Sequence, residues 1–240
     1  MKYKILNTSI DSFGLNETTD VIIKNIDKKK PIYQVSINAS KINLIDKEPR
    51  LKSIISRADI VNADGMSIIW AARILKVPVK HRVTGVDLFY KLLDISEEKG
   101  YSVYFLGATK ESITEMISRM RKNHPLLKIA GYHDGYYNDS ELIANEIKNS
   151  RPDILFLGFS SPQKEIWIEE YQKKVNVPFI MGVGGSFDIY SGKTKRAPKI
   201  VQKLGMEWFY RFIQEPVRMY DRYIIGNIIF VKKVLKERFK

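Results

Sequence analysis

The stretch that most clearly indicates the fold is Val177-Pro178-Phe179-Ile180-Met181-Gly182-Val183-Gly184-Gly185-Ser186-Phe187-Asp188. It opens with an apolar run long enough for one buried strand. The adjacent Gly184 and Gly185 would let the backbone approach a ligand more closely than any side chain allows. Phe187 and Asp188 then supply an aromatic face and a hydrogen-bond acceptor. The same residues also suit a tight turn from a strand into a helix, so the rest of the chain must decide between the two interpretations.

Similar apolar runs alternate along the chain with amphipathic, helix-like segments. We expect strands at residues 32–37, 59–61, 102–106, 153–157 and 178–183, and helices at residues 66–75, 86–99, 111–123, 141–149 and 165–174. Thr18 or Thr19 should cap an earlier helix. The alternation predicts an α/β fold with a Rossmann-like, mainly parallel sheet flanked by helices. Ligands of such sheets bind outside the carboxyl ends of the strands, which is where we look for functional residues.

The composition excludes several kinds of chemistry. The 240 residues contain no cysteine, so disulfides, thiolate nucleophiles and cysteine-based zinc sites are excluded. The first residues hold no apolar run long enough for a signal peptide, and no uncharged stretch approaches the roughly 20 apolar residues of a spanning helix. We therefore expect a cytoplasmic protein.

Positive charge is concentrated towards the C-terminal end. The whole chain carries a net charge of +13, and residues 193–240 hold 13 Lys or Arg against 4 Asp or Glu. Apolar residues recur there at helical spacing before Pro216 and again after it. We predict an α/β domain at residues 1–195 and a basic helical C-terminal appendage at residues 196–240. The appendage suits docking on an anionic membrane surface, but packing on the body or against a second copy of the chain stays open.

The first two strand ends and the segment before the next helix carry polar residues with two interpretations each. Asn38 could bind a sugar hydroxyl or stabilise a turn. Asp64 could cap the following helix through its carboxylate, or it could act as a general base. Arg82 could pair with a phosphate in a bidentate manner, whereas Thr84 and Asp87 are better explained by helix capping and the helix dipole.

Later strand ends add weaker candidates. The turn at Gly107 could hold an anion on free N–H groups. Tyr136 beside Asp134 could stack on a base, or the two could form a surface turn. After Gly158, Pro162 is expected at the first helical position, which places Gln163 and Lys164 in the first turn. Lysine opposes the helix dipole there, so an anion nearby would explain it.

Six motifs carry a more specific signal: Ala63-Asp64-Gly65, Arg82-Val83-Thr84-Gly85-Val86-Asp87-Leu88, Pro152-Asp153-Ile154-Leu155, Gly182-Val183-Gly184-Gly185-Ser186-Phe187-Asp188, Lys195-Arg196-Ala197-Pro198 and Gly205-Met206-Glu207-Trp208. Together they resemble the bacterial WecG/TagA/CpsF glycosyltransferases, family 26, over nearly the whole chain. One motif departs from the family pattern. Where many members read Pro-Lys-Gln-Glu or Pro-Arg-Gln-Glu, this chain has Pro162-Gln163-Lys164-Glu165.

The resemblance implies an inverting transfer of a hexose from a UDP-sugar to a polyprenyl-pyrophosphate-linked sugar, in teichoic acid or other cell-surface polysaccharide synthesis. N-acetylmannosamine is the first choice of hexose, and glucose or a uronic acid is the alternative. The resemblance further implies that Asp64 is the base and that the protein works on the inner face of the cell membrane. The residues expected to bind substrate are Asn38, Arg82, Gly107, Asp134, Tyr136, Gly158, Gln163, Lys164, Gly184, Gly185 and Asp188. Those expected to contact the acceptor pyrophosphate are Arg211, Arg218 and Arg222.

The charge that develops on departing UDP needs a partner. The sequence contains no Asp-x-Asp, and His133 has no partner histidine at ligand spacing. We therefore predict that arginines, lysines and helix N-termini meet this charge, without a metal ion or other cofactor.

Two other functional classes are less well supported. A nucleic-acid-binding protein would explain the positive charge, but no nucleic-acid motif accompanies it, so we expect no nucleic-acid partner. An NAD-dependent oxidoreductase would need Gly-x-Gly-x-x-Gly after an early strand, whereas the dense glycine cluster here comes late.

Overall fold

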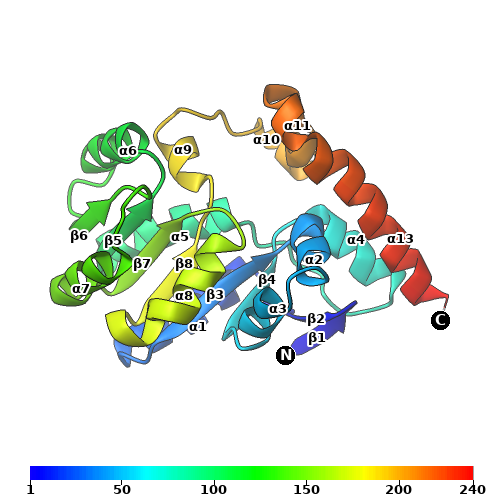
Figure 1. Cartoon of the computed structure of the whole chain (residues 1–240), viewed down its shortest axis with the longest axis horizontal. Coiled ribbons are helices and arrows are strands. Elements are labelled where there is room, and N and C mark those ends of the chain that lie inside the picture. The colour runs from blue at the N-terminus through cyan, green and yellow to red at the C-terminus, as the bar shows by residue number, and fades with distance from the viewer. Residues whose placement is uncertain (240) are drawn as a thin grey trace.

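A single parallel sheet forms the centre of the computed structural model, which describes residues 1–239 apart from the side chain of Arg218. Six strands pair in the order β4-β3-β8-β7-β5-β6, and every pairing is parallel (Figure 1). The strands are β3 (Ile32–Ile37), β4 (Ile60–Ala63), β5 (Ser102–Gly107), β6 (Lys128–His133), β7 (Ile154–Gly158) and β8 (Phe179–Gly182). The predicted α/β fold is therefore confirmed.

Helices cover both faces of the sheet, and the alternation of side chains along the strands explains why. Phe105 on β5 and Phe156 on β7 belong to one buried cluster, whereas their sequence neighbours Leu106 and Leu155 belong to the other. The first cluster is covered by α1 (Leu15–Asp27), α5 (Gly85–Lys99), α6 (Lys110–Asn123) and α9 (Ser186–Tyr190). The second is covered by α2 (Ala39–Ile45), α3 (Pro49–Ser56), α4 (Met66–Ile74), α7 (Ser140–Ser150) and α8 (Gln163–Val175).

Two glycines mark the point where the chain connections diverge. From β5 the chain runs through α6 to β6 on one side, and from β7 it runs through α8 to β8 on the other. Gly107 and Gly158 lie opposite each other at these strand ends. A Cβ on Gly107, which has φ +128°, would lie 2.8 Å from the Gly158 backbone. A Cβ on Gly158 would lie 2.5 Å from the Phe187 ring. Glycine is required at both positions because the backbones and the ring approach so closely.

Several local predictions need correction. An antiparallel hairpin, β1 (Lys2–Ile5) and β2 (Thr8–Asp11), precedes the sheet, and neither it nor β6 was expected. Helix α1 follows Gly14, so Thr18 and Thr19 lie inside it instead of capping it. Both are buried, and Thr18 Oγ1 accepts a hydrogen bond from Asn62 Nδ2 at 2.9 Å. Helix α8 begins at Gln163, so Pro162 precedes the first helical position.

The C-terminal segment packs along the body as a series of helices (Figure 1). These are α10 (Lys199–Lys203), α11 (Glu207–Gln214), α12 (Pro216–Met219), the π-helix η1 (Tyr220–Ile225) and α13 (Gly226–Arg238). Phe230 and Val234 of α13 are buried in the cluster that α2 and α4 share. Lys233 Nζ lies 2.6 Å from Asp46 Oδ2. Within the described part of the chain, every helix is too short or too polar to cross a bilayer. The division at residue 195 stays a prediction.

Candidate active site

Asp64 lies at the carboxyl end of β4, where its backbone continues the parallel pairing. Its N–H donates to the Ile37 carbonyl at 2.8 Å, and its half-buried Oδ1 accepts a hydrogen bond from the Gly85 N–H at 3.0 Å. The N-cap of α4 is Gly65, so the carboxylate does not cap its own helix and that interpretation is wrong. Among the described residues, no donor reaches Oδ2. The sheet edge thus holds a carboxylate with one oxygen available.

Asn38 ends the neighbouring strand. Its Oδ1 accepts a hydrogen bond from the Lys41 N–H at 3.0 Å, so it caps α2 as the turn interpretation predicts. Its Cβ lies 3.5 Å from the position that a Cβ on Gly65 would take. Asn38 therefore stabilises the start of α2 and also lies next to the turn at Asp64 and Gly65.

Lys164 reaches from α8 across the end of β8. Its Cδ lies 2.6 Å from the position of a Cβ on Gly182, and its Nζ lies 3.5 Å from the Gly182 carbonyl oxygen. The same Nζ is 3.7 Å from the Cβ position of Gly184, which has φ +53°. Burial, assisted by Lys41, lowers the pKa of Lys164 to about 8, although Glu165 and Asp64 favour its charged form. Lys164 thus lies at the glycine loop and is attracted by the carboxylate of Asp64.

A buried ion pair is formed by Lys41 and Glu165, the residue that follows this lysine in the sequence. Lys41 Nζ lies 2.6 Å from Glu165 Oε1, and both side chains are buried. Ser161 Oγ donates to the same oxygen at 3.0 Å. Burial opposes the charge of Glu165, but Lys41 and Lys164 together hold its pKa below the usual range. The carboxylate of Glu165, which favours the charged form of Lys164, is therefore already paired with another lysine. The adjacent Gln163 is exposed, and its Oε1 accepts a hydrogen bond from Ser160 Oγ at 3.0 Å.

One predicted arginine, Arg211, approaches the same loop from the C-terminal segment, and a second, Arg222, acts electrostatically on Lys164. Arg211 Nη2 lies 2.6 Å from the position of a Cβ on Gly185, and its buried Nε has no partner among the described residues. Arg222 lies 5.5 Å above the Tyr223 ring, and its charge contributes to the lowered pKa of Lys164. The side chain of Arg218 lies outside the described part of the structure. Lys164 and Arg211, which lie far apart in the sequence, therefore both approach the loop at Gly184 and Gly185.

The remaining candidates lie at the β5–β7 side and mainly stabilise turns. Asp134 Oδ1 accepts from the Tyr136 N–H at 2.8 Å, and the Tyr136 ring is 80% exposed. Asp188 Oδ1 accepts from Ser112 Oγ at 2.7 Å. Gly107 and Gly158 shape the strand ends, as described above. The end of β7 approaches the glycine loop through Phe159, whose carbonyl oxygen lies 3.7 Å from the Cβ position of Gly184.

Arg82 has a carboxylate partner from the C-terminal segment. Its Nη1 lies 3.3 Å from Glu207 Oε2, and its Nη2 donates to the Gln202 carbonyl at 3.3 Å. Glu207 and its second partner Arg196 were not predicted as site residues, although both lie in motifs noted above. Thr84 caps α5 as expected, since its Oγ1 accepts from the Asp87 N–H at 3.0 Å.

The arrangement can remove a proton from a hydroxyl and bind a negatively charged leaving group. The sequence matches the Glycosyl transferase WecG/TagA/CpsF family over residues 3–240. The chain belongs to this family. Among residues 1–239, no three His, Asp or Glu side chains gather as around a metal ion. The metal-independent mechanism stays a prediction.

Named relatives support the same class of enzyme. The chain is 34% identical to the N-acetylglucosaminyldiphosphoundecaprenol N-acetyl-beta-D-mannosaminyltransferase of Bacillus spizizenii over 88% of this chain and 81% of the relative. Proteins of the same name from Bacillus subtilis and Staphylococcus aureus strain MW2 are each 31% identical. These matches cover 89% and 87% of this chain and 82% of each relative. The predicted family and the predicted glycosyltransferase class are confirmed.

Proposed function

We propose that this protein transfers N-acetylmannosamine from a UDP-sugar to N-acetylglucosamine linked through a diphosphate to a polyprenyl lipid, in teichoic acid synthesis. The names of its relatives support the hexose and the acceptor. The observation that carries the proposal is the half-buried carboxylate of Asp64, which shares one sheet edge with a glycine loop approached by Lys164 and Arg211.

In the proposed reaction Asp64 takes the proton from the acceptor hydroxyl. The hydroxyl oxygen forms a bond to the anomeric carbon as the bond from that carbon to the UDP oxygen breaks, so the configuration inverts. A donor with UDP on the α face would give the β product that the names of the relatives state. Lys164 is proposed to meet the charge on UDP, while Arg211 and Arg222 contact the acceptor diphosphate.

A hydrogen bond keeps the base in place. The Gly85 N–H donates to Asp64 Oδ1, which leaves Oδ2 to receive the proton. Gly85 opens the first turn of α5, so the helix dipole stabilises the carboxylate as well. The fold therefore orients the carboxylate before substrate binds.

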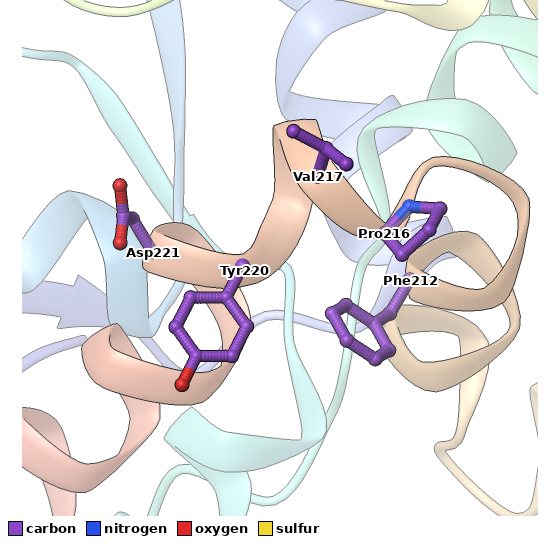
Figure 2. A pocket seen from close by; sticks show the side chains of 5 residues that line it. All are labelled: Phe212, Pro216, Val217, Tyr220 and Asp221. Carbon is purple, nitrogen blue, oxygen red and sulfur yellow. The ribbon is translucent and has the colours of Figure 1, made fainter.

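We also propose that the C-terminal segment places the enzyme on the inner membrane surface, where the lipid-linked acceptor resides. An open groove of about 400 Å³ lies in this segment. Figure 2 shows the side chains that line it, Phe212, Pro216, Val217, Tyr220 and Asp221. Val217 is 93% exposed, and basic residues flank the groove in the sequence. Apolar side chains surrounded by cations suit insertion between anionic headgroups.

The substitution Asp64→Asn tests the proposed base. Asn keeps an oxygen for the Gly85 N–H, so the fold should persist, while turnover should fall roughly 100-fold to 10,000-fold. UDP release is followed with a synthetic polyprenyl-diphosphate acceptor and UDP-N-acetylmannosamine, and thermal unfolding reports on the fold. Asp94→Asn is the matched control because its side chain is 66% exposed on α5. A near-normal rate in Asp64→Asn would refute the assignment.

A further inference from the structure

Glu207 bridges two arginines that lie far from each other in the sequence. Its Oε2 lies 3.3 Å from Arg82 Nη1, and its Oε1 lies 3.2 Å from Arg196 Nε. Arg196 extends the chain of charges, since its Nη2 lies 2.6 Å from Asp87 Oδ1. Burial opposes the charge of Arg196, but Asp87 and Glu207 together raise its pKa. The four side chains connect the first turn of α11 to the start of α5.

A second set of contacts holds the same junction. Arg82 also donates to the Gln202 carbonyl, and Gln202 Nε2 donates to the Ala197 carbonyl at 2.6 Å. Gly205, with φ +73°, packs against the Met66 side chain so closely that a Cβ at this position would displace it. The residues that precede α11 are thus fixed in place on both sides of the carboxylate.

Helix α11 connects this junction to the glycine loop, because it contains both Glu207 and Arg211. Arg211 follows Glu207 by four residues, so both side chains lie on the same side of the helix, one turn apart. Arg211 Nη2 lies 2.6 Å from the Cβ position of Gly185, so the guanidinium occupies the space that a side chain at this position would fill. A small rotation or shift of α11 would move Arg211 away from the loop.

We propose that Glu207 is a positioning residue, which holds α11 against Arg82 and Arg196 so that Arg211 lies over Gly185. The proposal deepens the proposed function, because it assumes that Arg211 serves the transfer reaction. Between 19% and 25% of each of the Glu207, Arg82 and Arg196 side chains is exposed. Partly exposed ion pairs contribute little to stability, so the loss of this carboxylate should affect turnover more than folding.

The substitution Glu207→Gln tests the proposal. We expect kcat/KM for transfer to fall roughly 10-fold to 100-fold, because a displacement of about 1 Å at a positioning residue can have an effect of that size. Glu207→Asp keeps the charge and should recover part of the loss. Thermal unfolding should change by only a few degrees.

Glu169→Gln is a closely matched control. Glu169 also bridges two arginines, Arg50 at 2.7 Å and Arg57, and 24% of its side chain is exposed. It connects α8 to α3 instead of α11 to α5. We expect its kcat/KM to stay within about twofold of the unaltered protein. An equal loss in both variants would overturn the proposal.

A double-mutant cycle separates positioning from an independent role. If Glu207 acts through Arg211, the double variant Glu207→Gln, Arg211→Gln should be no slower than Arg211→Gln alone. Losses that multiply would overturn the proposal.

Amide hydrogen exchange gives a measure that does not depend on turnover. Residues 207–214 should exchange faster in Glu207→Gln than in the unaltered protein or in Glu169→Gln. If none of the proteins transfers sugar, the proposed function fails, while exchange still decides whether Glu207 holds α11. Unchanged exchange would overturn the proposal.

Discussion

Replacing Lys164 with methionine should stabilise the folded protein and at the same time lower its transfer activity. The pKa of Lys164 falls from 10.5 to about 8 in the folded protein, because burial and the neighbouring Lys41 disfavour the charge. A shift of that size corresponds to roughly 3 kcal/mol of differential interaction. Because the side chain keeps some exposure, we expect Lys164→Met to raise the free energy of unfolding by about 1–3 kcal/mol at pH 7.

The sign of the pH dependence follows from the two pKa values. Between about pH 8 and pH 10.5 the unfolded chain binds more protons at this position than the folded chain, so its contribution to stability rises with pH. Below about pH 8 both states are protonated and the full cost of burying the charge is present. The advantage of Lys164→Met should therefore shrink across this interval and vanish above it.

Urea denaturation of variant and unaltered protein at the same pH, repeated from pH 7 to 10.5, measures this difference. Lys41→Met is the matched control, because Lys41 pairs with buried Glu165 at 2.6 Å. Its removal takes away the lysine that is hydrogen-bonded to buried Glu165 and should destabilise the protein by about 3–5 kcal/mol. Transfer activity of Lys164→Met should fall, since UDP loses a proposed partner. If Lys164→Met unfolds more easily at pH 7, or if its advantage does not depend on pH, the reasoning is wrong.

Two further predictions concern the glycine loop and the groove. Gly185→Ala places a Cβ 2.6 Å from the end of Arg211, which can move aside, so kcat/KM should fall about 10-fold while thermal unfolding stays within a few degrees; unchanged kinetics would contradict a role for this contact. Val217→Glu should weaken sedimentation with anionic liposomes several-fold, whereas Leu126→Glu, at a side chain 77% exposed on the body, should not; equal effects would exclude the groove as the membrane contact.

The sheet was predictable because its strands are buried on both faces and read as continuous apolar runs. Edge strand β6 was missed because its residues from Lys128 to His133 are only partly buried and mix polar with apolar types. The first hairpin was missed for a related reason. Its strands have four residues each, and each combines one buried isoleucine, Ile5 or Ile10, with polar or charged residues.

The candidate site was predictable as a set of strand ends but not as a set of contacts. The positions of Asp64, Gly184 and Lys164 follow from where strands end and helices begin. The partner of Arg82 does not follow, because Glu207 lies over a hundred residues away and either a phosphate or a carboxylate satisfies a guanidinium equally well. Asp188 had a similar ambiguity, and the structure gives it Ser112 as a partner.

By itself, the sequence determined the parallel sheet and the edge at which the carboxylate lies. Both follow from short-range patterns: the periodicity of apolar residues and the points at which strands end. Only the tertiary structure decided that Arg211 lies over Gly185, that Glu207 holds Arg82, and that Lys164 reaches the loop without a carboxylate of its own. Such contacts depend on how α11 and α8 pack against the body, and the residues that meet there share no local pattern in the chain.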